Sequence, residues 1–248
     1  MSIDKRNTRK LPYQFYAHGR TDHLENVVPR VYSVRETPKT LKEGPIVYQE
    51  NEYQYRCDNP LTDNTKGPKY IALGCSRTYG VGVRESDTWP AILKSKIKKK
   101  LPNQPVEIYN MGVPAGSLET SYRVLKNWID IIQPRAVFLF TPPGWRREII
   151  KEKEIDLIFD GHPLADKLKG VSSFHSDNNH RDYMVKAIGY HCAEYRAKLF
   201  VIDNSAIEQT DYGNDGMHQG PVTNRFCLLY TSDAADEGLG VDLGGRRI

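Results

Sequence analysis

The stretch Lys69-Tyr-Ile-Ala-Leu-Gly-Cys-Ser-Arg-Thr-Tyr-Gly-Val-Gly82 predicts how the chain folds and where its chemistry lies. Residues 70–73 form a short apolar strand that stops at Gly74, and Ser76 follows two residues later. Side chains at the carboxyl end of a parallel strand project into the crevice where open α/β sheets bind their ligands. Ser76 is therefore a candidate nucleophile, although an ordinary turn from strand to loop needs the same small residues.

Strand and helix patterns alternate after residue 69. Apolar runs predict strands at 70–73, 106–109, 136–140 and 198–202, and helical spacing of apolar residues predicts helices at 89–97, 118–132 and 183–195. This order predicts a parallel, doubly wound sheet with right-handed connections. The segment 145–179 is charged and shows no regular pattern, so we expect an irregular insertion over one edge of the sheet.

The 248 residues divide into three regions. Residues 1–68 are polar and rich in tyrosine and proline, with strand-like pieces at 27–34 and 46–55, and we expect an extended N-terminal arm that packs on the main domain. The main domain is predicted at 69–226. Residues 227–248 lack periodicity and closely resemble translated sequencing-adapter DNA, which predicts a non-native or disordered tail.

Composition argues against two classes of partner. The net charge of +4 is modest and the lysines gather at one predicted helix end, residues 94–100, so we expect no nucleic-acid partner. No apolar run reaches the roughly 18 residues that a membrane span needs, and the basic N-terminus lacks the apolar segment of a secretory signal. We therefore expect no membrane partner and a cytoplasmic location.

Neither a metal nor a cofactor is expected. The cysteines are scattered without Cys-x-x-Cys spacing, which predicts free thiols in a reducing compartment: Cys57, Cys75, Cys192 and Cys227. Four histidines show no ligand spacing: His162, His175, His180 and His191. A phosphate-binding loop is suggested by Gly74, Gly80 and Gly82, but no Gly-Lys-Ser/Thr follows.

Three loops together hold what an acyl-transfer site requires. The first carries Ser76. In the second, residues 110–117, Gly112 lies just beyond a predicted strand, so its N–H could approach a substrate oxygen. In the last, Asp215 and His218 are three residues apart, which lets the carboxylate hold the imidazole in one tautomer while the other ring nitrogen accepts the serine proton. Ordinary turn chemistry could also explain this last loop.

These blocks resemble the SGNH hydrolases, also called the GDSL esterase/lipase family. Strand-Gly-Cys-Ser, then Asn-Met-Gly, then Asp-Gly-Met-His occur in the order of that family over roughly residues 69–224. The resemblance implies a flavodoxin-like three-layer α/β/α sandwich with a parallel sheet. It also implies that Ser76 is the nucleophile, His218 the general base and Asp215 its orienting partner, with the N–H groups of Ser76 and Gly112 forming the oxyanion hole.

The chain departs from the family pattern at two places. Cys75 replaces the usual acidic residue before the nucleophile; as an alternative nucleophile it should point away from Ser76. Where the family carries Gly-x-Asn-Asp, this chain has Thr141-Pro-Pro-Gly-Trp-Arg146, so the asparagine that donates to the oxyanion is missing. Thr141 and Arg146 are the candidate substitutes and candidate substrate contacts.

The sequence therefore favours a serine esterase that uses a Ser-His-Asp triad on a small ester, with acetyl groups on carbohydrate as the candidate substrate. Without the block III asparagine, a catalytically weak or inactive SGNH-like module that binds carbohydrate or serves a structural role is the alternative. A flavodoxin-like ligand-binding domain unrelated to hydrolysis shares the fold and is the third hypothesis.

Overall fold

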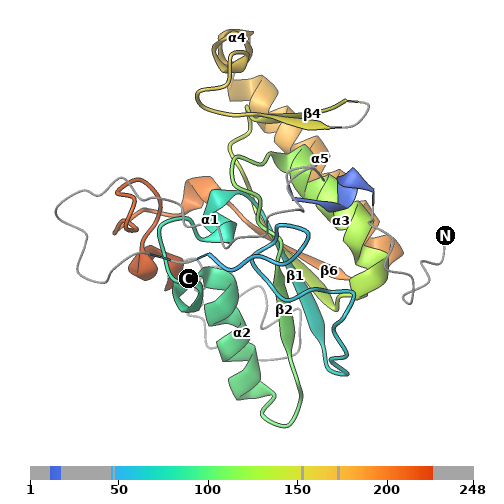
Figure 1. The fold of residues 1–248 in the computed structure, drawn as a ribbon. Helices are drawn as coiled ribbons and strands as arrows, with labels where there is room; N and C mark the ends of the chain where they lie inside the picture. The colour runs from blue at the N-terminus through green and yellow to red at the C-terminus, as the bar shows by residue number, and fades with distance from the viewer. Residues whose placement is uncertain (1–11, 18–45, 47, 152–153, 172–173, 226–248) are drawn as a thin grey trace.

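Four parallel strands form the central sheet of the computed structural model, which describes residues 12–17, 46, 48–151, 154–171 and 174–225 (Figure 1). Their order across the sheet is β2 (Glu107–Asn110), β1 (Lys69–Leu73), β3 (Ala136–Phe140) and β6 (Lys198–Ile202). The register pairs Leu73 of β1 with Leu139 of β3, and Ala72 with Asn110 of β2. Because the strands are parallel and in this register, their carboxyl ends meet at one edge of the sheet.

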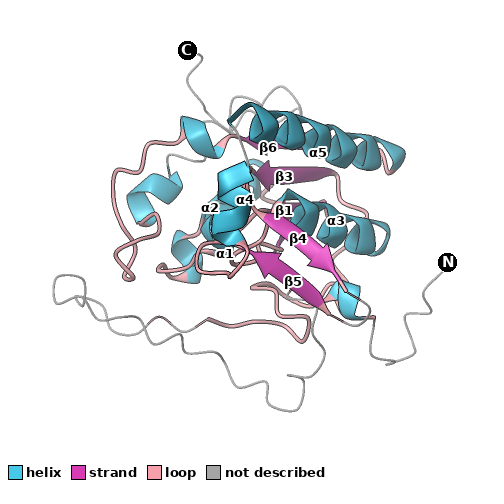
Figure 2. Cartoon of the chain, turned by 90° about the horizontal axis from the view of Figure 1, so that it is seen from above, coloured by secondary structure: helices cyan, strands magenta, loops and turns pink. Residues whose placement is uncertain are grey.

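Helices cover both faces of this sheet (Figure 2). Helix α2 (Trp89–Lys100) packs on one face, and α3 (Leu118–Ile132) and α5 (Phe174–Glu194) pack on the other. Successive residues of β1 alternate between the two cores: Tyr70 and Ala72 face α2, whereas Ile71 and Leu73 face α3 and α5. The predicted three-layer α/β/α sandwich is confirmed.

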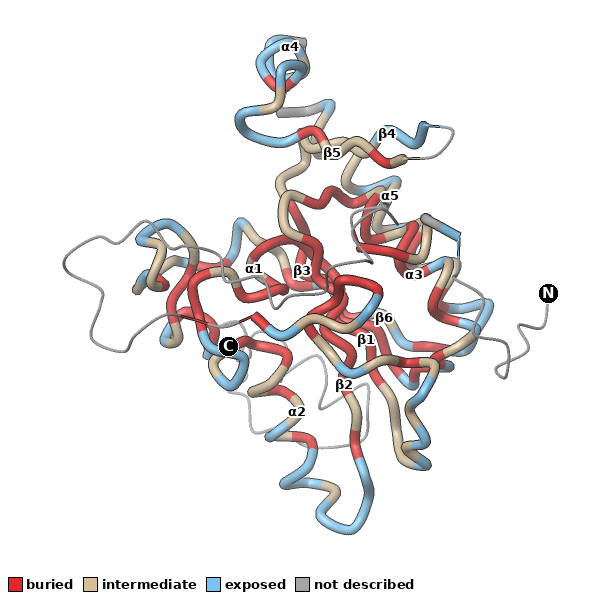
Figure 3. Tube along the Cα trace, viewed as in Figure 1, coloured by how far each residue is buried: buried red, intermediate tan, exposed pale blue. Residues whose placement is uncertain are grey.

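Short helices and a hairpin complete the fold. They are η1 (Tyr13–Phe15), α1 (Ser76–Tyr79), η2 (Glu85–Asp87), the antiparallel hairpin of β4 (Arg147–Ile150) and β5 (Ile155–Ile158), α4 (Ala165–Val171) and η3 (Asn204–Ala206). The hairpin and α4 project beyond the carboxyl ends of the strands, and much of this projection is exposed (Figure 3).

The expectation of an irregular segment at 145–179 is therefore wrong. The hairpin pairs only with itself, and the predicted start of the third helix at residue 183 misses the opening turns of α5. Residues 176–182 of those turns are exposed or half-buried. A helix that does not pack on the core along its whole length needs no apolar stripe there, so its spacing pattern is absent.

The described part of the N-terminal arm contacts α3. Arg123 of α3 donates hydrogen bonds to the carbonyl oxygens of Gln14, Tyr16 and Ala17 at 2.7–3.0 Å, and the Trp128 indole N–H donates to that of Phe15 at 3.0 Å. Three tyrosines of the arm belong to the same core cluster as Trp128: Tyr16, Tyr53 and Tyr55.

Three expectations for residues outside the main domain remain: two strand-like pieces and the tail. The strand predicted at 46–55 is wrong for the described residues there, because the Asn51 side-chain oxygen accepts hydrogen bonds from the N–H groups of Tyr53 and Tyr55 and so closes a local turn. The piece at 27–34 and the tail at 227–248 lie outside the described residues.

Candidate active site

Ser76 is the first residue of α1, directly after the turn that leaves β1. The turn requires glycine at position 74, where φ is +149° and a Cβ atom would lie 2.7 Å from the carbonyl oxygen of Phe140. Only 6% of Ser76 is exposed. The first N–H groups of a helix have no acceptor within it, and none of the described residues accepts from the Ser76 N–H. Its hydroxyl and a free N–H are thus presented together.

The loop 211–221 brings His218 to Ser76. Nε2 of His218 lies 2.9 Å from Ser76 Oγ, and Nδ1 of the same ring hydrogen-bonds Asp215 Oδ2. With the Nδ1–H donating to the carboxylate, Nε2 carries the lone pair and accepts from the serine hydroxyl. The three side chains form one hydrogen-bonded chain from carboxylate to hydroxyl.

The carboxylate of Asp215 is stabilised in its charged form. Burial raises its pKa. Hydrogen bonds from the His218 ring and from the backbone N–H groups of His218 and Met217, at 3.0 and 3.1 Å, lower the pKa by more than burial raises it. The net result is a pKa below the ordinary aspartate value. Asp215 is therefore ionised at neutral pH and suited to orient the imidazole.

The loop after α1 supports the loop that carries Asp215 and His218. The Gly82 carbonyl accepts a hydrogen bond from the Asn214 N–H at 2.7 Å, and the Gly82 N–H donates to the Tyr48 hydroxyl at 2.8 Å. Tyr48 belongs to the N-terminal arm. Two hydrogen bonds, through Gly82, therefore connect a residue of the arm with the turn that holds Asp215.

Arg56, also from the arm, holds the end of α1. Its buried guanidinium donates to the carbonyl oxygens of Tyr79, Gly80 and Val83 at 3.1, 2.7 and 3.0 Å. The guanidinium carbon lies 4.7 Å from the centre of the Tyr48 ring, within cation–π range. The carbonyls that a helix leaves without partners at its C-terminus are satisfied here by a side chain from outside the sheet.

A cavity of about 860 Å³ opens in front of Ser76 and His218. The loop after β2 contributes Pro114 and Ala115, the loop after β3 contributes Pro143 and Arg146, and the loop after β6 contributes Asn204. The hairpin side adds Ile155, Asp156, Leu157, Phe159, Asp160 and His162. The loops at the carboxyl ends of four strands thus surround the candidate nucleophile, as expected for this class of sheet.

The structure places Gly112 differently from the prediction. Its N–H donates to the Asn110 side-chain oxygen at 3.2 Å, and Gly112 does not line the cavity. A Cβ at this position would lie 2.3 Å from the Tyr79 nitrogen, so glycine is required for close packing against α1. Ala115, which sequence reasoning missed, lines the cavity with φ at +66°, and none of the described residues accepts from its N–H.

Thr141 is also engaged away from the cavity. Its buried hydroxyl accepts a hydrogen bond from the Asn204 N–H at 3.1 Å and lies 3.4 Å from the Ile202 carbonyl oxygen, so it joins the ends of β3 and β6. The side-chain Oδ1 of Asn204 is buried without a partner among the described residues. Asn204 is the second cavity residue that sequence reasoning missed; its signal is an amide in the loop directly after a buried strand.

Cys75 lies beside the candidate nucleophile instead of pointing away from it. Its sulfur is 4.0 Å from Ser76 Oγ, and the residue lines the cavity. The His218 ring nevertheless contacts the serine oxygen at 2.9 Å. Among the described residues, Cys57, Cys75 and Cys192 are all free thiols.

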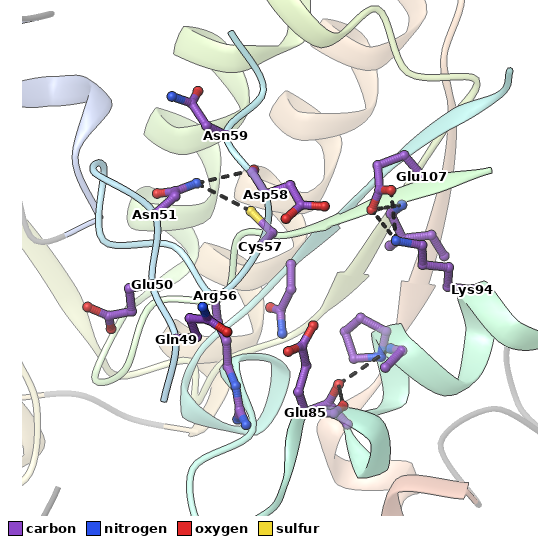
Figure 4. A pocket seen from close by; sticks show the side chains of 15 residues that line it. Gln49, Glu50, Asn51, Arg56, Cys57, Asp58, Asn59, Glu85, Lys94 and Glu107 are labelled. Atoms are coloured by element: carbon purple, nitrogen blue, oxygen red, sulfur yellow. Dashed lines mark hydrogen bonds and ion pairs between the residues drawn. The ribbon is translucent and has the colours of Figure 1, made fainter. Parts of the chain in front are cut away.

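A second, smaller cavity of about 280 Å³ lies between the arm and α2 (Figure 4). It is lined by polar side chains that largely satisfy one another. Lys94 Nζ contacts both Glu107 carboxylate oxygens at 2.6 and 2.7 Å, and the Asn51 amide donates to the Asp58 carbonyl oxygen at 3.3 Å. Neither Ser76 nor His218 lines this cavity, so it is not part of the candidate active site.

Two kinds of feature are absent from the described part of the chain. None of its helices is long and apolar enough to cross a membrane. No group of three or more histidine, cysteine, aspartate or glutamate side chains within it is arranged to hold a metal ion.

No protein-family model matches this sequence, and no curated protein matches it. Similar solved structures include a protein assigned to the lipolytic G-D-S-L family from Desulfitobacterium hafniense DCB-2, with 14% identity and a TM-score of 0.39 over 66% of this chain and 98% of that one. A mutant of Axe2, an acetyl-xylooligosaccharide esterase from Geobacillus Stearmophilus, shows 12% identity and a TM-score of 0.40 over 74% of this chain and 99% of that one. Esterase EstA from Pseudoalteromonas sp. shows 12% identity and a TM-score of 0.40, over 69% of this chain and 98% of that one. Of these three similar structures, two are described as esterases and one as a lipolytic protein of the G-D-S-L family.

Proposed function

We propose that this protein is a serine esterase that hydrolyses small esters through an acyl-enzyme. One observation carries the proposal: Ser76 Oγ lies 2.9 Å from His218 Nε2, and the other nitrogen of that ring is bound to Asp215. A nucleophile, a base within hydrogen-bond reach and a group that orients the base are the parts that nucleophilic catalysis by serine requires.

The reaction follows from this geometry. Ser76 Oγ attacks the ester carbonyl carbon while its proton passes to His218 Nε2. The carbon–oxygen bond to the alcohol then breaks, and His218 returns the proton to the departing oxygen. Water attacks the acyl-serine in the second half, gives its proton to Nε2, and releases the carboxylic acid as Ser76 recovers its hydroxyl. Asp215 stays ionised and stabilises the imidazolium formed in each half.

The oxyanion needs donors that are fixed before the reaction. We assign this role to the N–H groups of Ser76 and Ala115, because both residues line the cavity and neither N–H has an acceptor among the described residues. Ala115 takes the place predicted for Gly112. Asn204 is our candidate for the third donor, because no hydrogen bond among the described residues fixes its amide, which can therefore present its nitrogen to the cavity.

The test combines labelling with turnover. A fluorophosphonate probe should label the wild-type protein at Ser76, and p-nitrophenyl acetate should be hydrolysed at a rate that falls by about 10⁴-fold or more in Ser76→Ala. Unchanged thermal unfolding of the variant is the control. Release of acetate from acetylated oligosaccharides, measured in parallel, tests the candidate substrate. A folded wild type that is neither labelled nor active would overturn the proposal.

A binding module on the same fold is the second candidate. It is favoured by the loop after β3, where the chain has proline in place of an asparagine and the Thr141 hydroxyl is bound to Asn204. Carbohydrate binding in calorimetry, together with no labelling and no turnover, would support this function instead.

A further inference from the structure

The larger cavity contains an arginine, Arg146, for which the described residues provide no carboxylate partner. Arg146 lines the cavity with Ser76 and His218, and its Nε and Nη1 atoms are buried without a hydrogen-bond partner. The neighbouring Arg147 shows the usual arrangement: its guanidinium donates to two backbone carbonyls and lies 3.8 Å from Glu119 and 3.7 Å from Asp177. The described residues therefore offer partners to one arginine of this pair and none to the other.

The acidic side chains of the cavity already have basic partners. Asp156 contacts Lys151 at 3.3 Å and His162 at 3.2 Å, and Asp160 is bound to Lys169. For the second arginine of the cavity, Arg77, the one side-chain partner among the described residues is the amide oxygen of Gln209, at 3.4 Å. Neither arginine of the cavity is therefore paired with a carboxylate among the described residues.

Leaving buried guanidinium atoms without a partner is costly, because they lose water and gain nothing in return. A carboxylate in the cavity removes that cost when the Arg146 guanidinium turns toward it, since its two oxygens match the planar fork of donors on arginine. We propose that Arg146 binds a carboxylate of the substrate, so that the preferred ester carries an acidic group in addition to the bond that is cleaved. This inference rests on the proposed esterase function and specifies its substrate class.

This role differs in a measurable way from the oxyanion role suggested by the sequence. A guanidinium that bound the oxyanion would act on every ester and would change kcat. A guanidinium that binds a carboxylate on the substrate acts on acidic esters alone and mainly changes KM, since that contact exists before and during the reaction.

The experiment compares esters that differ in one acidic group. Mono-p-nitrophenyl glutarate and p-nitrophenyl valerate place the group on the acyl side; 4-acetoxybenzoate and its methyl ester place it on the alcohol side. In at least one pair, wild-type kcat/KM should be about 10-fold or more higher for the acidic ester, the range of a charge-assisted hydrogen bond. High salt should reduce this preference.

Substitutions then assign the preference to the residue. Arg146→Met should lower kcat/KM for the preferred acidic ester by about 10- to 100-fold, mainly through KM, and leave its neutral partner within about twofold. Arg146→Lys should recover part of the loss. Lys98→Met removes one exposed cation from the end of α2 and is the control for net charge; it should change neither ester.

The outcomes separate this inference from the function on which it rests. Wild-type protein that hydrolyses neutral esters but shows no preference for the acidic ester in either pair would overturn the carboxylate site and leave the esterase intact. An equal fall in kcat for both members of a pair in Arg146→Met would also overturn it, in favour of the oxyanion role. Absence of turnover on all four esters would refute the esterase function itself.

Discussion

Gly82 and Asp215 pack so closely that no side chain fits between them. A Cβ atom on Gly82 would lie 2.8 Å from Asp215 Oδ1, and the Gly82 backbone has φ at +83°. The carboxylate that orients His218 is therefore seated on bare backbone of the loop that follows α1. The geometry of the proposed base, His218, thus depends on a glycine that does not line the cavity.

We expect Gly82→Ala to lower kcat by displacing Asp215 and with it the His218 ring. A misplacement on the scale of 1 Å costs about 10²-fold in rate. The measurement is p-nitrophenyl acetate hydrolysis, with Gly170→Ala as the control, because nothing lies within 4 Å of a Cβ at that position. Full activity in a folded Gly82→Ala protein would show that the loop adapts and that close packing of Asp215 on Gly82 is not required.

Asp215→Asn should remove the orientation of the imidazole and lower kcat by about 10⁴-fold. It should also change how stability depends on pH. The folded pKa of Asp215 lies below its unfolded value, so the unfolded state binds more protons between the two, and the stabilisation present at neutral pH is lost as pH falls through the folded pKa.

The measurement for Asp215 is the free energy of unfolding of both proteins from pH 7 to pH 3. The wild type should exceed Asp215→Asn at neutral pH, and the difference should shrink on acidification. A difference that stayed constant over this range would contradict the depressed pKa.

Asn204→Ala should lower kcat by about 10²–10³-fold with little change in KM, the loss typical of one oxyanion donor. The neighbouring Ser205→Ala is the matched control, because this exposed serine does not line the cavity. Equal kcat in the two variants would leave the oxyanion to the backbone N–H groups of Ser76 and Ala115.

Arg123→Met should destabilise the fold. The buried Arg123 guanidinium binds the Glu148 carboxylate through Nε at 2.8 Å and Nη2 at 3.1 Å, in addition to three carbonyls of the arm. Removing one partner of a buried pair leaves the other charge uncompensated, at a cost of about 3–5 kcal/mol. Urea unfolding monitored by tryptophan fluorescence measures the loss.

The double variant Arg123→Met/Glu148→Met tests the cause of that loss. It should recover part of the stability, because no buried charge remains unpaired. A double variant as unstable as the sum of the two single variants would show that the charges do not act as a pair.

Much of the fold can be predicted from the sequence because burial leaves a pattern. The strand 136–140 is apolar throughout, since both of its faces are covered, and α3 has the predicted bounds 118–132 because its apolar stripe, its Ser117 cap and Pro134 agree. The hairpin 147–158 lies outside the central sheet and buries only Ile155 and Ile158 among its described residues, and residues 176–182 of α5 are exposed or half-buried. They need no such pattern, and sequence reasoning missed them.

The candidate site was predictable only where its residues are close in sequence or at an expected strand end. Asp215 and His218 share one loop, and Ser76 follows a strand. The search for a glycine N–H led to Gly112, although the residue with the positive φ and the unengaged N–H is an alanine, Ala115. Asn204 reaches the cavity from the loop after β6, where a hydrogen bond to Thr141 holds its backbone. Spacing alone does not reveal that contact.

Arg56 supports the candidate active site although it precedes the first strand of the sheet. Helix α1 has only four residues, too few for its own hydrogen bonds to keep it ordered, and its last carbonyls are held by a side chain that precedes the first strand. Substitution of Arg56, which does not line the larger cavity, can therefore adjust the direction of the Ser76 hydroxyl. Directed evolution restricted to residues around the substrate would leave this means of tuning the nucleophile unused.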